Sequence, residues 1–487
     1  MTKYDKYDIV VGLEVHAQLK TNTKIFAPDA TVFGAEPNSQ TSYITLGHPG
    51  TLPRTNHKAV TYAVKMGLAT NCHIQKVNRF DRKNYFYPDL PKGYQITQFN
   101  LPICVNGKVH ITTEQGTKAI GITQIHLEED AGKSIHDIDP SFSCIDLNRA
   151  GVPLIEIVSE PDLRSSDEAY AYLIKIKKLL TFLDICDGNM EEGSMRCDAN
   201  VSVRLKGTTQ YGERTEVKNM NSLRNVKKAI EFEAKRQIDL LENGQQINRE
   251  TRSFDASNDT TFALRSKELA HDYRYFPEPD LPPVVLSDED IATIKADMPP
   301  LAHQLFELFT QKMGLSNYDA GVLTDTKEIA YYYQNACQYT TQYKALSNWI
   351  TGPIKAHIKQ HNTTMTHFEL SPKKLSELVA LVAQGKISFA KAAQLLLPEL
   401  IKKPTANVEQ LAQQMNLIMD NNQQDIDTFI QQAIDKYPDK VAEYKRSNKK
   451  RQKGLLGLFM GELMKISKGK ANPKTATAIL IKKLNDY

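Results

Sequence analysis

Short runs of alternating apolar and polar residues, separated by Gly, Pro and Asn, occupy most of the first 295 residues. The run from Asp198 to Arg204 alternates at every position, which is typical of a strand with one apolar and one polar face. Helical spacing occurs over 169–183, after a capping sequence at 165–168, and over 223–241. This mixture predicts an α+β body. The polar face of the alternating run needs water or a ligand as its partner; its members are Asp198, Asn200, Ser202 and Arg204.

After the proline pairs at 282–283 and 299–300 the apolar spacing becomes helical almost throughout. An Asn- and Gln-rich stretch over 404–425 predicts a polar connector within this helical part. We therefore predict a body at 1–295, an all-helical domain at 296–410 and a helical tail domain at 411–487. Capping and terminating residues mark individual helices, namely Ser371-Pro372, Gly385, Ser388 and Asn472-Pro473.

Positive charge gathers in the predicted tail. Residues 411–487 hold 14 Lys and Arg against 8 Asp and Glu, a net charge of +6, whereas the whole chain carries +4. A basic segment on a near-neutral body suits a polyanion, and its cations would contact phosphate rather than read bases. A solvated, lysine-rich helical surface is the alternative. The cations assigned to this contact are Lys449, Lys450, Arg451, Lys453, Lys468 and Lys470.

Composition excludes several classes of protein. The N-terminus is polar, and no stretch approaches the roughly 20 apolar residues of a membrane span, so we expect a cytoplasmic protein without membrane contact. The six cysteines form no Cys-x-x-Cys pair, so their spacing supports neither a disulfide scaffold nor a zinc finger.

An acid and an imidazole interrupt an apolar run near the N-terminus. Glu14 and His16 are two residues apart and therefore share one face of a strand. Burying both groups is costly unless they are satisfied, and a hard divalent cation is one suitable partner. A hydrogen-bonded Glu/His pair, with separate salt bridges elsewhere, is the alternative. Further acids that could complete one or two cation sites lie on or beside predicted strands, namely Glu128, Glu129, Asp198 and Glu216.

Cations accompany one of these acids, because Glu216 shares its strand face with Arg214 and Lys218. Such a mixed face suits metal-bound phosphate better than an apolar core. The common phosphate-binding loops are absent: the P-loop pattern before Lys133 needs glycine where Leu127 stands, and no G-x-G-x-x-G occurs. The sequence also contains no G-x-S-x-G nucleophile elbow. Aromatic and basic residues over 79–95 could stack on a base or an aminoacyl end, or form core with a cationic rim.

Taken together, several segments resemble GatB, the B subunits of the tRNA-dependent amidotransferases of the GatCAB type, and the resemblance spans almost the whole chain. The family's fold implies a cradle-like body related to glutamine synthetase, an all-helical domain and a helical tail that meets tRNA. The matching segments are Val11–Leu19, Tyr85–Gln95, His126–Lys133, Asn148–Glu156, Gly188–Asn200, Glu216–Ser222, Asp272–Pro279 and Gly457–Pro473.

The resemblance implies a cytoplasmic enzyme component that acts on Glu-tRNA(Gln), Asp-tRNA(Asn) or both. ATP would activate the side-chain carboxylate as an acyl phosphate, and ammonia from the amidase partner GatA would replace the phosphate, with the small partner GatC in the complex. That division of labour explains why no nucleophile for glutamine hydrolysis is found here. The implied cofactors are ATP and Mg²⁺. The expected metal ligands are Glu14, His16, Glu128, Glu129 and Glu216, with Asp198 a weaker member, and Lys218 and Arg274 are expected to contact phosphate or carboxylate.

One departure and two alternatives accompany this interpretation. Family members often carry a Cys-x-x-Cys before the Leu46–Gly50 segment, but Ser42 and Thr45 stand at those positions, so we expect no structural zinc. A non-catalytic tRNA-binding scaffold of the same complex is one competing hypothesis. The related archaeal protein GatE is another, but it carries an inserted domain for which 487 residues leave no room.

Overall fold

β1 (Tyr7–Gln18) crosses the middle of a large mixed sheet, with β11 on one side and β10 on the other. The computed structural model describes residues 2–266, 273–419, 423–467 and 471–486, and within these the sheet has 12 strands. Its main path runs β14-β13-β12-β11-β1-β10-β7-β5-β4-β15, and β6 and β2 extend from β7. Adjacent pairs are antiparallel except β12 and β13, which are parallel.

The strands of this body follow the short alternating runs of the sequence. β11 (Met195–Leu205) contains the run predicted at 198–204, which confirms that strand. The remaining strands are β2 (His73–Ile74), β3 (Val77–Asn78), β4 (Asp81–Asn84), β5 (Tyr94–Thr97), β6 (Cys104–Thr113), β7 (Gly116–Glu129), β8 (Lys133–Ile135), β9 (Cys144–Asp146), β10 (Pro153–Ser159), β12 (Thr215–Lys218), β13 (Glu250–Asp255), β14 (Thr260–Ser266), β15 (Phe276–Pro277) and β16 (Val284–Val285).

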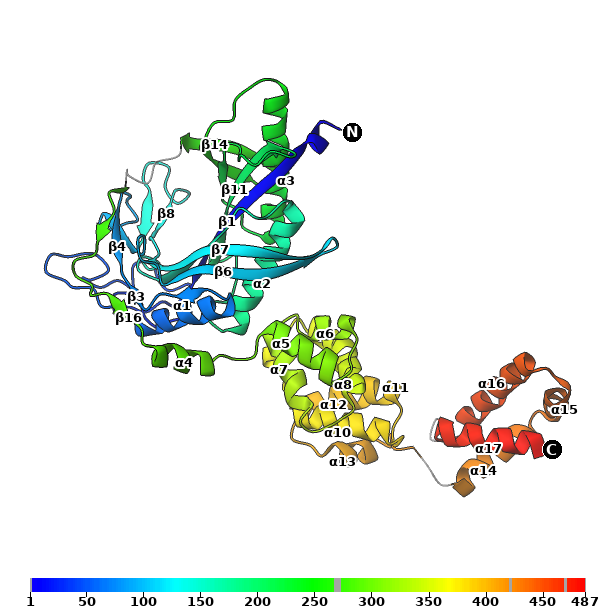
Figure 1. Ribbon diagram of the computed structural model, residues 1–487. Coiled ribbons are helices and arrows are strands. Elements are labelled where there is room, and N and C mark those ends of the chain that lie inside the picture. Colours follow the sequence, from blue (N-terminus) through cyan, green and yellow to red (C-terminus); the bar gives the residue numbers. More distant parts are fainter. Residues whose placement is uncertain (1, 267–272, 420–422, 468–470, 487) are drawn as a thin grey trace. The chain divides into compact units, whose positions relative to one another are not determined.

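Helices cover one face of the sheet, and the other face carries the polar residues of β1. α2 (Ser166–Phe182) and α3 (Leu223–Glu242) pack together and against β6 and β11 (Figure 1). On β1 the apolar residues alternate with polar ones, and Val11, Leu13 and Val15 are at most 1% exposed. Burial of this alternating set fixes the register of β1, because a shift by one residue would move all of it to the other face. Glu14 and His16 consequently lie on the opposite face.

Both helices predicted in the body are confirmed. Ser165 caps α2 by accepting a hydrogen bond from the Glu168 backbone N–H. The Glu168 carboxylate instead accepts from the Arg164 backbone N–H at 2.7 Å, so the second half of the predicted capping box is not formed. The other helical segments of the body are η1 (Lys3–Lys6), α1 (His57–Ala69) and α4 (Asp288–Ala296).

The rest of the chain is helical, as the spacing predicted. The two compact units are Met1–Leu301 and Ala302–Tyr487. In the second unit the predicted caps Ser371 and Ser388 are confirmed. Its segments are α5 (Ala302–Glu307), η3 (Leu308–Lys312), α6 (Asn317–Leu323), α7 (Lys327–Ala336), α8 (Tyr343–Trp349), η4 (Ile350–Ile354), α9 (Lys355–Gln360), η5 (Met365–His367), α10 (Pro372–Ala383), α11 (Phe389–Lys391), η6 (Ala392–Leu396), α12 (Leu397–Lys402), α13 (Val408–Gln414), α14 (Gln423–Asp435), α15 (Pro438–Arg446), α16 (Lys449–Ile466) and α17 (Pro473–Asp486).

The C-terminal helices share a hydrophobic core of their own. Ile430 of α14, Phe459 and Leu463 of α16 and Leu480 of α17 are fully buried in it. The boundary predicted at residues 410 and 411 falls inside α13, which packs against α10. The three-domain division with its stated limits stays a prediction. None of the helices in the described part of the chain has the length and apolar character needed to span a bilayer.

Candidate active site

The register of the sheet brings acids from distant parts of the chain to the face that carries Glu14 and His16. Glu14 pairs with Asp198 on β11, and His16 pairs with Glu156 on β10. Glu156 in turn pairs with His126 on β7. Directly opposed residues share a face, so these side chains converge on one patch of the sheet.

His16, Glu128 and Glu156 form the first cluster, called here the His16 cluster. One ligand atom from each lies within 4.8 Å of the other two. Nε2 of His16 is 3.3 Å from Oε2 of Glu156 and 3.7 Å from Oε1 of Glu128. His126, on β7, lies beside both acids. Its Nε2 is 3.3 Å from Oε2 of Glu156 and 3.8 Å from Oε2 of Glu128.

Glu14, Asp198 and Glu216 form the second cluster, called the Glu14 cluster, which satisfies the same 4.8 Å criterion. Asn200 donates a hydrogen bond of 2.8 Å to Oε1 of Glu14. Thr251 donates one of 2.9 Å to Oε2 of Glu216. The two clusters are neighbours, because Glu14 and His16 are separated by one residue of β1.

Lys218 lies at the edge of the Glu14 cluster. Its Nζ donates to Asp198 and is 3.5 Å from Oε1 of Glu216. Burial alone would lower the pKa of Lys218, but the Asp198 and Glu216 carboxylates outweigh burial and raise it. The side chain is 36% exposed, so the ammonium can also reach an anion above the sheet.

The pKa values of Glu14 and His16 are both raised by the many carboxylates on this face. Burial raises the pKa of Glu14, and the Glu156, Glu216 and Asp198 carboxylates raise it further. Burial opposes the charged form of His16, yet Glu156 and Glu128 raise its pKa to about 9. A divalent cation bound in such a buried site would relieve the repulsion between the acids and would take the place of the proton on the histidine.

The donor atoms of the two clusters fit divalent cations. Glu14, Asp198 and Glu216 offer only carboxylate oxygens, which suits a hard cation such as Mg²⁺. The His16 cluster offers one imidazole nitrogen and two carboxylates, a set that suits Mn²⁺ as well as Mg²⁺. His126 orients both carboxylates of that set, as supporting groups around metal ligands do.

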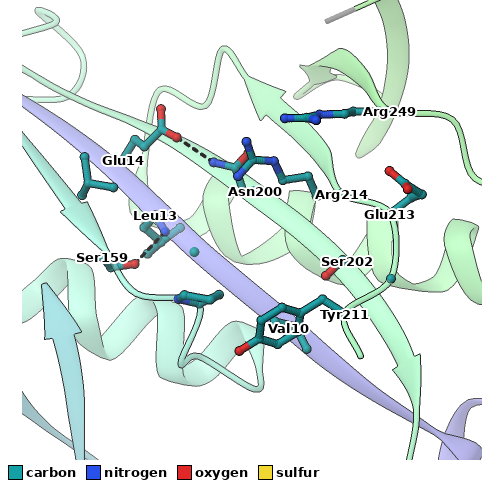
Figure 2. A pocket seen from close by; sticks show the side chains of 14 residues that line it. Val10, Leu13, Glu14, Ser159, Asn200, Ser202, Tyr211, Glu213, Arg214 and Arg249 are labelled. Atoms are coloured by element: carbon teal, nitrogen blue, oxygen red, sulfur yellow. Dashed lines mark hydrogen bonds between the residues drawn. The ribbon is translucent and has the colours of Figure 1, made fainter. Parts of the chain in front are cut away.

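A cavity of about 370 Å³ adjoins the Glu14 cluster on the same face. In Figure 2 Arg214 and Arg249 point toward the Glu14–Asn200 end of this cavity, while the Tyr211 ring lies toward Val10. Gly12 leaves the middle of the β1 wall without a side chain. A cavity with cations at one end and an aromatic ring at the other is suited to a nucleotide.

Two expected site residues lie apart from the clusters. Glu129 follows Glu128 on β7 but accepts hydrogen bonds from Lys92, at 2.5 and 2.7 Å, and from the Ile96 backbone N–H at 2.8 Å. It lines a different polar cavity, together with Lys24 and Lys92. Arg274 is exposed, with a left-handed backbone at φ 45°, and its carbonyl accepts from Asn84. The structure does not bring either residue to the clusters.

Sequence reasoning missed Glu156 as a ligand candidate. Its strand, Pro153–Ser159, is apolar apart from this acid and the terminal serine, which is the same signal that singled out Glu14. His126 likewise begins one of the segments that resemble the family but was not expected to take part in the site. Both residues carried a usable signal, namely a titratable side chain in the middle of an apolar strand.

The aromatic and basic segment 79–95 contains both buried and exposed rings, and its role stays a prediction: Phe80 is 1% exposed and Phe86 is 81% exposed. Lys83 lies over the rings of Tyr85 and Tyr273, with Nζ 5.6 and 4.9 Å from their centroids. Phe99 and Tyr275 stack at 4.0 Å. Burial raises the pKa of Tyr85, and the Glu128 carboxylate of the His16 cluster raises it further.

The residues at the expected zinc positions form a hydrogen-bonded unit. Ser42 donates to Oδ2 of Asp29 at 2.9 Å, and Thr45 donates to the same oxygen. One carboxylate thus ties the ends of the Ser42–Thr45 turn. These bonds give a physical basis for a stable loop without a metal, and the absence of zinc stays a prediction.

In the tail, Lys449, Lys450 and Lys453 are exposed in the first turns of α16. Arg451 is engaged by Glu443, with Nη2 2.6 Å from Oε1. Lys468 and Lys470 lie outside the described residues, as does Asp272 of one matching segment. Gly457 and Gly461 are four residues apart on α16, a spacing that can let a neighbouring helix approach closely, but within the described residues a Cβ at either would meet no atom within 4 Å.

These features define a class of protein: a mixed α+β body with an acid-lined sheet face, extended by a helical region. Residues 9–292 match the family described as the GatB/GatE catalytic domain, and residues 331–484 match the one described as the GatB domain. The chain is 47% identical over 483 residues to the B subunit of aspartyl/glutamyl-tRNA(Asn/Gln) amidotransferase from Geotalea uraniireducens, covering 99% of this chain and 100% of that protein. The corresponding protein of Chlorobium phaeobacteroides is 48% identical over 480 residues, covering 98% and 99%. The chain belongs to the GatB family, the B subunits of these amidotransferases.

Proposed function

We propose that this chain activates the side-chain carboxylate of Glu-tRNA(Gln), Asp-tRNA(Asn) or both with ATP. The activated acyl phosphate then reacts with ammonia, and the products are Gln-tRNA(Gln) and Asn-tRNA(Asn). The observation that carries the proposal is the adjacency of two cation-type clusters and a nucleotide-sized cavity along one strand, β1. Membership of the GatB family supports the same reaction.

The residues of the two clusters would hold Mg²⁺. When bound, such ions neutralise the charges that meet when a phosphoryl group is transferred to a carboxylate. Glu14, Asp198 and Glu216 would hold one ion, and His16, Glu128 and Glu156 the other. Asn200 keeps the Glu14 carboxylate in place through its hydrogen bond, and His126 does so for Glu128 and Glu156.

Cations of the protein complete the phosphate site. Arg214 and Arg249 lie in the cavity and Lys218 lies beside the Glu14 cluster, so all three can hold phosphate oxygens. Tyr211, at the other end of the cavity, offers a ring for the base. Arg274 is left without a role in this arrangement.

The wider proposal follows the family resemblance. Ammonia would come from the amidase GatA, and the small protein GatC would join the complex in the cytoplasm. The body would be the glutamine-synthetase-like cradle of the family, with no structural zinc at the Ser42–Thr45 turn. The tail domain would contact tRNA through its exposed lysines, including Lys449, Lys450 and Lys453.

The test is amidation by the complex reconstituted with GatA and GatC. Glu14→Gln and His16→Ala should each lower ATP-dependent Gln-tRNA formation by about 100-fold or more, because each removes a ligand of one cluster. Glutamine hydrolysis by the amidase should persist at least in part. Full amidation by either variant would contradict the metal assignment. Absence of ATP- and Mg²⁺-dependent phosphate release by the wild-type complex would favour the scaffold alternative.

Neighbouring glutamates provide a matched control for the ligand set. Glu128→Gln should weaken Mn²⁺ binding to the His16 cluster, measured by electron paramagnetic resonance, because it removes a ligand. Glu129→Gln should leave Mn²⁺ binding intact, because Glu129 pairs with Lys92 away from the cluster. Equal loss of Mn²⁺ binding in the two variants would show that the cluster is not the metal site.

A further inference from the structure

Arg196 lies at the end of the acid-lined face that is farthest from the nucleotide-sized cavity. It is the β11 partner of His16 in the sheet register. Its Nη2 donates to Oδ1 of Asp130 at 2.9 Å, and its side chain remains 36% exposed. Arg196 faces His16 across the β1–β11 pairing and lies two residues from Asp198 on the same face, so it adjoins both clusters. The Asp130 carboxylate raises the pKa of Arg196, and Glu128 and Asp198 add to this effect.

Asp130 holds this guanidinium in place. The acid is 3% exposed and also accepts a hydrogen bond of 2.8 Å from Gln18 Nε2. The nearby Arg149 also faces Asp130, with Nε 3.6 Å from Oδ2, and donates to the carbonyls of Ala131 and Gly132 at 2.9 and 2.6 Å. Arg196 has five N–H donors and, among the residues that the structure describes, uses one of them for Asp130, so its terminal nitrogens can bind another oxyanion.

The order of groups along β1 shows which oxyanion fits. The cavity adjoins Val10, Gly12 and Leu13, the Glu14 cluster follows, then the His16 cluster, and Arg196 with Gln18 lies beyond. Phosphoryl transfer requires the attacking and leaving oxygens to be roughly in line. A nucleotide in the cavity would direct its terminal phosphate toward the clusters, so the attacking carboxylate approaches from the Arg196 end.

We propose that Arg196 binds the side-chain carboxylate of the acidic aminoacyl group and aims one of its oxygens at the terminal phosphorus of ATP. This inference rests on the proposed function. The carboxylate oxygen forms a bond to the γ-phosphorus while the bond from that phosphorus to the ADP oxygen breaks, and the electron pair leaves with ADP. A guanidinium matches the planar carboxylate but has no such match with the neutral amide of the product.

The experiment compares two ligands that share one tRNA body. Dissociation constants for Glu-tRNA(Gln) and Gln-tRNA(Gln) are measured by filter binding to the reconstituted complex with Mg²⁺ and a non-hydrolysable ATP analogue. The wild type should prefer the carboxylate form by about tenfold or more, because a charge-assisted bond is lost with the amide. Arg196→Gln should bring the ratio of the two constants close to one, and Arg196→Lys should retain part of the preference.

Lys20→Gln is the matched control, because Lys20 follows the same end of β1 but pairs with Asp184 on the surface, at 2.8 Å. It should keep the wild-type ratio of the two dissociation constants.

An Arg196→Gln variant that keeps the wild-type ratio, or that weakens the binding of both ligands equally, overturns the proposal, since a structural role acts on both ligands. If Arg196→Gln does not fold, Arg196→Lys decides, and an unchanged ratio there overturns it. Wild-type complex that forms no Gln-tRNA would overturn the proposed function as well, whereas normal wild-type amidation with an unchanged variant ratio overturns the Arg196 role alone.

Discussion

Glu128 and Glu129 illustrate how neighbouring residues of one type acquire different environments. Consecutive residues of a strand point to opposite faces, so Glu128 joins His16 while Glu129 meets Lys92. A list of acids read from the sequence treats the two as equivalent. Glu156 shows the reverse case, because it was not on that list although the register places it directly beside His16.

Lys24 offers a test of electrostatics away from the clusters. It is 1% exposed, and burial lowers its pKa to about 8, although Asp29 and Glu129 oppose the decrease. Between about pH 8 and 10.5 the unfolded chain therefore binds more protons at this residue than the folded chain, so stability rises with pH across that interval. The cost is fully present below pH 8 and amounts to about 3 kcal/mol.

We expect Lys24→Met to raise the free energy of unfolding at pH 7 and to leave it nearly unchanged relative to wild type above pH 10.5. Urea unfolding at several pH values measures this difference. A constant gap between the two proteins from about pH 7 to about pH 11 would show that the burial of Lys24 does not perturb its titration.

At the scale of elements, α16 places positive charge where the helix dipole disfavours it. Its first turn contains Lys449 and Lys450 after the cap Asn448, and contains no acid. Cations at a helix N-terminus cost stability, whereas anions there are favourable. Lysines placed at this end of the helix despite that cost are suited to binding the phosphates of a nucleic acid.

Reversing these charges should separate stability from binding. The double variant Lys449→Glu, Lys450→Glu should raise the free energy of unfolding by roughly 0.5 kcal/mol, because it complements the dipole. The same variant should weaken tRNA binding and reduce its salt dependence by about one to two units of log–log slope. Lys465→Glu, in the last turn of the same helix, should instead lower stability. Unaltered tRNA affinity in the double variant would contradict the proposed contact.

Some elements of the fold follow from local sequence patterns, and the order of strands in the sheet does not. Helices over 169–183 and 223–241, the strand at 198–204 and the caps at Ser371 and Ser388 follow from local periodicity and capping chemistry. The order of strands in the sheet did not follow, because pairing between β1 and β11 joins residues that are far apart in the chain, for example Tyr7 and Leu205. Local patterns carry no information about such pairs.

At the scale of the whole molecule, the reaction and the tRNA contact are assigned to different units. The clusters lie in Met1–Leu301, and α14 to α17 enclose a separate core in Ala302–Tyr487. A deletion of 411–487 would cut α13, which packs on α10, so residues 423–487 are the better segment to remove.

Removal of 423–487 should raise the dissociation constant for tRNA and flatten its salt dependence, because the basic helices are lost. The amidation rate at saturating tRNA should fall less than the affinity does. Filter binding at several salt concentrations and single-turnover kinetics measure the two effects. Wild-type affinity after truncation would mean that the tail does not contact tRNA.

The amino-acid sequence by itself determined the order of an α+β body and a helical region, the shared face of Glu14 and His16, and the basic tail. These properties depend on neighbours within one or two turns or on simple composition. Only the tertiary structure decided which acids meet: it added Glu156, separated Glu129 and set Arg196 opposite His16. The physical reason is that strand register is fixed by burial of the whole apolar face of the sheet, and a shift of one residue would exchange every one of these contacts.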